Sequence, residues 1–257
     1  MNLFNLSGEV AFITGGNGGI GRGIALGLAA AGADVAIAAR DSGKSEAVRT
    51  EIEALGRRAV AVDCDVTSRT SIDEAVKATL AALEKISIVV NNAGIARGGP
   101  PATLSEADWD AVVDTNLKGT LLVSQACFPA LAANGRGKII NIGSEYSLFA
   151  NPNGLPYGAS KGGVITLTFG LADAWASHNI QVNAIIPGVI ETDIWRGALA
   201  VPDFRSRLER RTPAGRIGLP EDLAGPAVFL ASRASDFVTG QWFAVDGGVN
   251  IADPVIH

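Results

Sequence analysis

The chain has 257 residues, with 21 basic and 26 acidic side chains, a formal net charge of −5 and two cysteines. This length can bury a sizeable core without disulfides, and the acidic balance disfavours nucleic acid or an anionic membrane as a partner, because both attract positive surfaces. Cys64 and Cys127 belong to no paired motif, so we expect neither a disulfide framework nor a zinc site.

The first eight residues contain no apolar run of signal-peptide length. No stretch reaches the roughly 18 uninterrupted apolar residues that a membrane span requires. We therefore expect a soluble, cytoplasmic protein with no membrane partner.

Short apolar runs recur along the chain, and the early ones are followed by longer segments with a helical pattern, at about residues 19–31, 44–55 and 71–83. The runs do not alternate between apolar and polar residues, which is typical of strands that are buried on both faces. Strands that alternate with helices predict a parallel sheet with helices on both sides. We expect about seven strands, at Val10–Thr14, Val35–Ala38, Ala59–Val62, Ile86–Val90, Lys138–Ile142, Ile180–Ile186 and Trp242–Val245.

A glycine-rich segment, Thr14–Gly21, follows the first strand and opens the first helix. Glycine permits a tight turn, and its missing Cβ lets a pyrophosphate approach the backbone. The amide groups at the start of a helix then favour the anion. The segment therefore predicts a dinucleotide-binding turn, although its spacing is Gly-x-x-x-Gly-x-Gly rather than the commoner Gly-x-Gly-x-x-Gly.

These patterns predict an α/β protein with a single-domain, Rossmann-type doubly wound fold over residues 1–257, whose parallel sheet of about seven strands is flanked by helices. One long irregular stretch, residues 188–213, contains a charged cluster from Arg205 to Arg211. A loop of this length in a compact domain is usually functional or disordered. We expect it to cover the substrate, with a solvated helix face as the alternative for the arginine cluster.

Tyr157 and Lys161 stand four residues apart, on one face of a predicted helix. An ordinary tyrosine has a pKa of about 10, too high for ready proton exchange near neutrality. A nearby ammonium group and the positive nicotinamide ring of an oxidised dinucleotide would both lower that pKa. Tyr157 could then act as the general base in alcohol oxidation and as the general acid in carbonyl reduction.

At this point the sequence resembles the short-chain dehydrogenase/reductase family, from about Leu6 to Gly248. Several motifs in a fixed order carry the resemblance, and together they are more specific than any one of them. They are the glycine-rich segment, Asn91–Gly94, Asn116, Ser144, Tyr157, Lys161 and Pro187–Gly188.

The resemblance implies hydride transfer between a nicotinamide cofactor and a secondary alcohol or ketone, with Asn116, Ser144, Tyr157 and Lys161 as catalytic residues. Ser144 would hydrogen-bond to the substrate oxygen and orient Tyr157. Lys161 would bridge the nicotinamide ribose hydroxyls and lower the pKa of Tyr157. Asn116 would hold a water molecule that links Lys161 to solvent. Alternatively, Asn116 caps backbone groups and Ser144 is a turn residue. No metal is implied.

The resemblance also implies which residues contact the cofactor. Thr192 would hold the carboxamide, Asp65 would contact the adenine, and Asn92 and Gly94 would line the path of the dinucleotide. The full expected set is Gly15, Asn17, Gly19, Ile20, Gly21, Arg40, Asp65, Val66, Asn92, Ala93, Gly94, Tyr157, Lys161, Pro187, Gly188, Ile190 and Thr192.

The choice between NADP and NAD depends on the end of the second strand. Ala39 stands where an acidic residue would select NAD, and Arg40 could pair with the 2′-phosphate of NADP. Gly18, at a position where many NADP-dependent relatives carry a basic residue, and Asp41, beside Arg40, point the other way. We expect NADP or NAD as the cofactor, with NADP slightly favoured.

The substrate is expected to be a small polar molecule. The segments Arg211–Asp222 and Val245–Gly248 are similar to those of sugar and sugar-acid dehydrogenases, and also to those of relatives that act on cyclic alcohols and ketones. Arg97 could bind a substrate carboxylate or could simply be solvated. The other candidates for the pocket wall, of mixed polarity, are Glu145, Tyr146, Asn151, Asn153, Trp195 and Arg196.

Three alternative functions fit the sequence less well. A 3-oxoacyl-(acyl-carrier-protein) reductase tends to present basic residues to its acidic carrier, but Asp173 stands where arginine is common. Gly158–Gly162 matches the Gly-x-Ser-x-Gly pattern of serine hydrolases around Ser160, but no strand precedes it and only His178 and His257 could serve as bases. A non-catalytic regulator would have lost the tyrosine or the lysine, and both are present.

The resemblance further implies a homotetramer. The long helices around Trp109 and Tyr157 and the strand at Trp242 would lie at its interfaces.

Overall fold

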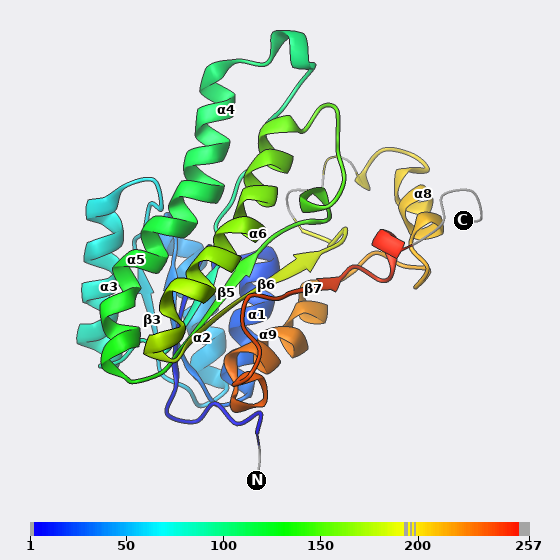
Figure 1. The fold of residues 1–257 in the computed structure, drawn as a ribbon. Helices are drawn as coiled ribbons and strands as arrows, with labels where there is room; N and C mark the ends of the chain where they lie inside the picture. Colours follow the sequence, from blue (N-terminus) through cyan, green and yellow to red (C-terminus); the bar gives the residue numbers. More distant parts are fainter. Residues whose placement is uncertain (1–2, 193–194, 196, 198, 252–257) are drawn as a thin grey trace.

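Over the residues that the computed structural model describes, 3–192, 195, 197 and 199–251, seven parallel strands form one sheet (Figure 1). Their order is β3-β2-β1-β4-β5-β6-β7, so the direction in which strands are added reverses between β1 and β4. The strands are β1 (Val10–Thr14), β2 (Asp34–Ala38), β3 (Ala59–Val62), β4 (Ile88–Asn91), β5 (Gly137–Ile142), β6 (Ile180–Pro187) and β7 (Trp242–Val245).

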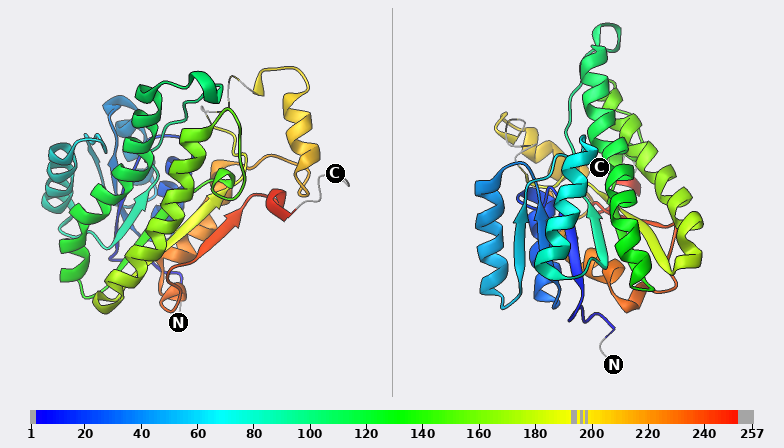
Figure 2. Two further views of the ribbon diagram at one scale, coloured as in Figure 1. Left: turned by 45° about the horizontal axis from the view of Figure 1, so that its top comes forward. Right: turned by 90° about the vertical axis from the view of Figure 1, so that its left-hand side faces the viewer.

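Helices connect the strands and lie on both sides of the sheet (Figure 2). Helix α4 projects beyond the carboxyl ends of the strands, and α8 lies apart from the sheet at the same end of the molecule (Figure 1). No helix among the described residues is long and apolar enough to cross a membrane. The helices are α1 (Gly19–Ala30), α2 (Ser42–Ala54), α3 (Arg69–Leu83), α4 (Glu106–Val113), α5 (Gly119–Ala133), α6 (Leu155–Trp175), α8 (Phe204–Arg211) and α9 (Ala224–Ala231).

The predicted fold class is confirmed, and the predicted strands match the observed ones closely. The fourth strand begins at Ile88 instead of Ile86, and Ser87 just before it contacts the start of β1 through both its backbone and its side chain. The Val10 amide donates a hydrogen bond of 3.0 Å to the Ser87 hydroxyl. Burial explains why unalternating apolar runs form these strands: every residue of β1, β2, β4, β5 and β6 is buried, whereas the edge strand β7 leaves Trp242 40% exposed.

Apolar side chains on the two faces of the sheet form two separate core clusters. On one face, side chains of the strands pack against α1, α2 and α9, with Ile24 and Leu230 among the buried residues. On the other face they pack against α3, α5 and α6, with Ile72 and Val123 buried. The two layers fix the sheet from both sides, so the loops at the carboxyl ends of the strands stand on a rigid frame.

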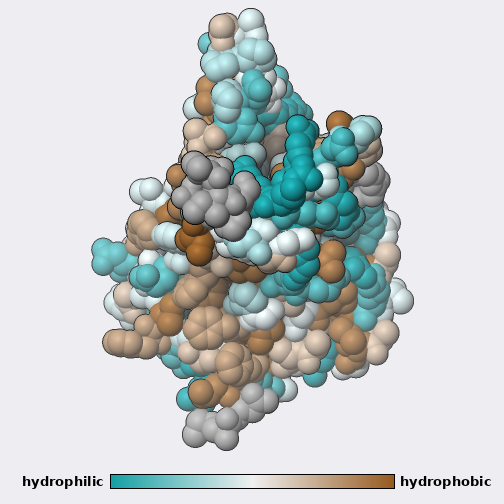
Figure 3. Space-filling view, turned by 90° about the vertical axis from the view of Figure 1, so that its right-hand side faces the viewer, coloured by the Kyte–Doolittle hydropathy of each residue, from teal (hydrophilic) through white to brown (hydrophobic). Residues whose placement is uncertain are grey.

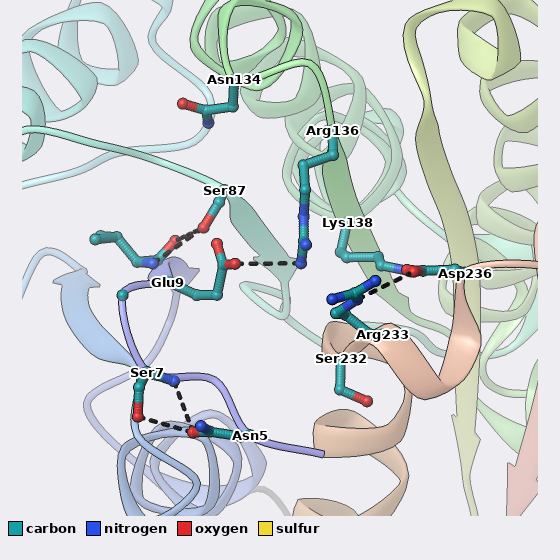
Figure 4. A network of polar contacts seen from close by, with 12 residues as sticks. Asn5, Ser7, Glu9, Ser87, Asn134, Arg136, Lys138, Ser232, Arg233 and Asp236 are labelled. Carbon is teal, nitrogen blue, oxygen red and sulfur yellow. Dashed lines mark hydrogen bonds and ion pairs between the residues drawn. The ribbon is translucent and has the colours of Figure 1, made fainter. Parts of the chain in front are cut away.

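A network of charged side chains lies at the amino-terminal ends of the strands, opposite these loops (Figure 4). Glu9, just before β1, pairs with Lys85 at 2.9 Å and with Arg136 at 3.2 Å. Burial alone would raise the pKa of Glu9, but hydrogen bonds from Ser87 and Lys85, together with the charge of Arg136, hold it below its ordinary value. The network therefore ties the starts of β1, β4 and β5 together.

Replacing Glu9 with glutamine should lower the free energy of unfolding by about 1 to 2 kcal/mol at pH 7, because charged hydrogen bonds to a largely buried carboxylate are lost. The depressed pKa in the folded state means that this stabilisation is present above the unfolded pKa of about 4.3 and is lost as the pH falls through the folded value. Urea unfolding of both proteins at pH 7 and at about pH 3 measures the effect.

The matched control is Asp73→Asn, whose partner Arg69 and own side chain are each 52% exposed, so a smaller change is expected. An equal loss of stability in the Glu9 and Asp73 variants, or a Glu9 effect that persists unchanged in acid, would contradict the role of the network.

Candidate active site

A cavity of about 660 Å³ opens at the carboxyl ends of β1, β4, β5 and β6. This position is where the strand order reverses, which is where doubly wound sheets bind their ligands. The structure brings most of the predicted site residues together in its wall. These are Gly15, Asn17, Gly19, Ile20, Asn92, Ala93, Gly94, Arg97, Ser144, Glu145, Tyr146, Asn151, Asn153, Tyr157, Lys161, Pro187, Gly188, Ile190, Thr192 and Trp195.

Some predicted residues do not line the cavity. Arg40 is exposed at the end of β2, and its charge acts on Asp65. The Asp65 carboxylate accepts hydrogen bonds from the Thr67 amide (2.9 Å) and hydroxyl (2.7 Å), which hold its pKa below the ordinary value. Val66 is buried, and Arg196 lies outside the described residues.

Sequence reasoning missed several residues of the cavity wall. Lys44 on α2 lines the cavity, but the sequence pattern of this helix did not indicate that Lys44 belongs to a site. Ile142, the last residue of β5, is another, and the rest have little side chain to signal a function: Gly18, Ala96, Gly98, Gly99, Gly143 and Gly154.

The glycine-rich turn is held to the loop after β4 by a set of short hydrogen bonds. The Asn92 side-chain amide donates to the carbonyl oxygens of Thr14 (3.0 Å) and Gly15 (2.9 Å). In return, the Thr14 hydroxyl accepts from the backbone amides of Asn92 and Ala93. A Cβ on Gly21 would overlap the Gly15 carbonyl oxygen, so this glycine is required by close packing although it does not line the cavity.

Asn116 is fully buried in a π-helical turn, Asp114–Lys118, between α4 and α5. Its side chain accepts from the Ile95 amide (2.9 Å) and donates to the Ile95 carbonyl (3.0 Å) and to the Ser160 hydroxyl (3.1 Å). It therefore fastens the loop after β4 to helix α6. Turns of this kind interrupt helices most often at functional sites, and the sequence pattern did not reveal this one.

Lys161 lies one helical turn after Tyr157 on α6 and is almost fully buried. Its ammonium donates a hydrogen bond of 2.7 Å to the carbonyl of Ile142, the last residue of β5, and lies 5.8 Å from the centre of the Tyr157 ring. Burial lowers the pKa of Lys161 to about 8. The group therefore remains mostly protonated at neutral pH but is easier to deprotonate than an ordinary lysine.

The Tyr157 phenol and the Ser144 side chain are hydrogen-bonded to each other. The predicted lowering of the Tyr157 pKa depends on Lys161 together with the positive nicotinamide ring, and it stays a prediction. Burial raises this pKa above its ordinary value, the Ser144 hydrogen bond opposes the rise, and the neighbouring Glu145 and Tyr146 add to it. The reason is that removing a phenolate from water costs more here than the Ser144 hydrogen bond recovers.

The serine-hydrolase alternative is wrong. Ser160 lies inside α6, fully buried, and its hydroxyl donates to the Tyr157 carbonyl oxygen at 2.8 Å. The serine of a Gly-x-Ser-x-Gly hydrolase motif lies on an exposed turn between a strand and a helix, and no such turn surrounds Ser160. His178 is exposed just beyond the C-terminal end of α6, where its ring meets the edge of Phe128, and His257 lies outside the described residues.

Comparisons with known proteins agree with this geometry. The family model described as enoyl-(acyl carrier protein) reductase matches residues 15–250. Gluconate 5-dehydrogenase from Gluconobacter oxydans is 41% identical over 98% of both chains. The 2-dehydro-3-deoxy-D-gluconate 5-dehydrogenase from Dickeya dadantii is 42% identical over 96% of this chain and 98% of its own. The crystal structure of a gluconate 5-dehydrogenase from Burkholderia cenocepacia, in complex with NADP and tartrate, has a TM-score of 0.93 at 41% identity and covers 98% of this chain and 99% of that one.

The ionisation of Tyr157 offers a direct test of the charge pattern in the cavity. Because Glu145 raises the pKa of Tyr157, Glu145→Gln should lower it. The chain has two tyrosines, so in a Tyr146→Phe background the phenolate absorbance reports Tyr157 alone. Titration of this background with and without Glu145→Gln should shift the transition to lower pH in the glutamine variant. A transition that moves to higher pH, or stays in place, would contradict the assignment.

Proposed function

The chain belongs to the short-chain dehydrogenase/reductase family, and from this premise we propose that it is an NAD(P)-dependent oxidoreductase that interconverts a secondary alcohol and a ketone, on a sugar acid or a similar polar alcohol. One observation carries the proposal: Ser144, Tyr157 and Lys161 meet in the same cavity as the glycine-rich turn. A non-catalytic regulator would not need this arrangement of ionisable groups.

The turn between β1 and α1 fits the phosphates of a dinucleotide. Gly15 and Gly19 adopt positive φ angles, of 61° and 48°, which only glycine adopts without strain. They leave open backbone at the start of α1, where amide groups and the helix dipole favour an anion. A bound nicotinamide dinucleotide would supply the hydride chemistry, and the protein groups orient the reactants and move the proton.

The chemistry of the protein groups follows from their contacts. Ser144 holds the substrate oxygen beside the Tyr157 phenol, which takes up the hydroxyl proton during oxidation and returns it during reduction. Lys161 is fixed by the Ile142 carbonyl beneath the tyrosine, so its charge favours the phenolate at the moment of transfer. Asn116 acts as a positioning residue, because its side chain is fully engaged with Ile95 and Ser160.

Tyr157→Phe should lower kcat by at least about 100-fold, the usual contribution of a positioned general acid or base, with little effect on cofactor affinity. Turnover is followed by the absorbance of reduced nicotinamide, and binding by its fluorescence. The matched control is Tyr146→Phe, which removes the other phenol of the cavity and should cost far less. Near-normal turnover in the Tyr157 variant would overturn the assignment.

We propose that the cofactor is NADP in preference to NAD. The Asp41 side chain accepts a hydrogen bond of 3.1 Å from the Lys44 amide, so this carboxylate stabilises the first turn of α2 as its N-cap. Arg40 is exposed beside it, and Lys44 adds a second positive side chain at the cavity wall. This positive charge supports binding of a 2′-phosphate.

Arg40→Ala should reduce kcat/KM for NADP by about 10- to 100-fold, because a charge-assisted hydrogen bond to phosphate is lost, while kcat/KM for NAD changes little. Arg49→Ala is the control, since Arg49 lies on α2, the helix that follows Arg40, and pairs with Glu46 at 2.6 Å. Initial rates with both cofactors measure the effect. An equal loss with NAD and NADP, or a wild-type preference for NAD, would show that Arg40 has another role.

The wall of the cavity supports a hydroxylated, acidic substrate. Arg97 lies in the wall and pairs with Asp108 at 3.3 Å, with a side chain that is 54% exposed and able to reach a carboxylate. The Asn151 side chain is hydrogen-bonded to Tyr146. An acyl-carrier-protein substrate is less favoured, because an acidic carrier would meet the exposed Asp173 and a net charge of −5.

The segment 188–213 is proposed to cover the substrate. Trp195 lines the cavity, and its ring stacks on Phe204 of α8 with centroids 6.3 Å apart. Glu191 pairs with Arg205 at 2.6 Å, which joins the start of the segment to the same helix. The residues named here therefore link α8 to the cavity wall.

We also propose a cytoplasmic homotetramer. Trp109 on α4 and Trp242 on the edge strand β7 are each 40% exposed, at the positions where the resemblance places interfaces. Apolar residues gather on the lower part of the face that carries β7 and α9 (Figure 3). Burial of such surfaces against further copies of the chain would complete the assembly.

A further inference from the structure

Glu145 directly follows Ser144, in the short 3₁₀ turn Glu145–Ser147 at the end of β5. The Ser144 hydroxyl accepts a hydrogen bond from the Tyr146 amide, which fixes the turn. Glu145 lines the cavity, yet the residue is only 4% exposed. A carboxyl group is thus buried in the wall of the cavity, next in sequence to the serine that holds the substrate oxygen.

One oxygen of this carboxyl group lacks a partner. Among the residues that the structure describes, none forms a hydrogen bond with Oε2 of Glu145. Buried carboxylate oxygens are normally satisfied by donors, because leaving one unpaired is strongly unfavourable. Glu145 lines the cavity, but Oε2 itself has almost no accessible surface, so a change of the Glu145 rotamer is needed before a bound molecule can supply the missing donor.

The charges around Glu145 indicate which kind of donor fits. Burial raises the pKa of Glu145, Arg211 from the end of α8 opposes the rise, and Asp246 after β7 adds to it. Arg211 also lies over the Phe149 ring, 5.3 Å from its centre, so it is held near this turn. The acidic Glu145 and Asp246 would repel a substrate carboxylate. A hydroxyl group is uncharged, so it is not repelled and can donate a hydrogen bond to Oε2.

We propose that Oε2 of Glu145 accepts a hydrogen bond from a substrate hydroxyl on a carbon next to the reacting carbon, so that the enzyme selects vicinal diols over isolated secondary alcohols. The inference rests on the proposed function and adds one specificity-determining residue to it. In the proposed function the reacting oxygen lies between Ser144 and Tyr157. Glu145 is next to Ser144 in the chain and lines the same cavity, so a hydroxyl on the adjacent carbon can reach the carboxyl group.

The test compares D-gluconate with 4-deoxy- and 6-deoxy-D-gluconate, which lack one of the two hydroxyls that flank carbon 5. Wild-type kcat/KM for gluconate should exceed that for one of the two analogues by about 10- to 100-fold, because the analogue leaves the carboxylate oxygen unpaired. Glu145→Leu should reduce this ratio to less than about 3, and Glu145→Gln, whose amide oxygen still accepts, should give an intermediate ratio.

The ratio is the informative readout, because any effect of the substitution on Tyr157 or on folding acts on both substrates alike. Glu74→Gln, an exposed residue of α3, is the matched control and should leave the ratio as in the wild type. If the leucine variant does not fold, the glutamine variant carries the test, with a ratio at least about 3-fold below the wild type.

Two outcomes overturn the inference alone: a wild-type enzyme that oxidises gluconate and both analogues equally well, or a leucine variant that keeps the full ratio. Either would assign the Glu145 oxygen to a water molecule or to a structural role. Failure of the wild type to oxidise any of the three substrates with either cofactor would instead contradict the proposed substrate class, and the inference would fall with it.

Discussion

The hydrogen bond between the Lys161 ammonium and the Ile142 carbonyl is the contact on which the site depends. It joins helix α6 to the last residue of β5 at 2.7 Å. The same helix carries Tyr157, and the same strand leads into Ser144, so one contact sets the position of the phenol relative to the serine. Because β5 is a central strand that is buried on both faces, this geometry rests on the most rigid part of the fold.

Burial disfavours the charged forms of both Lys161 and Tyr157. It lowers the pKa of Lys161 to about 8 and raises that of Tyr157, so both groups are driven towards their neutral forms. Glu145 adds to the rise at Tyr157. A positive nicotinamide ring in the cavity would shift this balance back towards the phenolate. Proton transfer is then coupled to the binding of the oxidised cofactor, because Tyr157 loses its proton more readily when that cofactor is bound.

The sequence predicted the sheet, the glycine-rich turn and the set of residues at the carboxyl ends of the strands, because burial on both faces and strand order leave a clear pattern. It also predicted most of the residues that line the cavity, but not Lys44. Asp65 was expected to contact the adenine, but it does not line this cavity, and its carboxylate accepts hydrogen bonds from the Thr67 amide and hydroxyl. Three further features depend on contacts between distant segments, which no local sequence pattern encodes. They are the π-helical turn around Asn116, the hydrogen bond from Asn92 to the Gly15 carbonyl and the unpaired oxygen of Glu145.

The central claim is that burial raises the pKa of Tyr157 in the free protein and that the charge of an oxidised nicotinamide lowers it. The most direct measurement is the pKa of Tyr157 by NMR of ring-labelled tyrosine, in the free enzyme and in its complexes with NADP⁺ and NADPH. The account predicts a pKa above the ordinary tyrosine value in the free enzyme and a clear decrease in the NADP⁺ complex, larger than in the NADPH complex. The same pKa in all three states would contradict it.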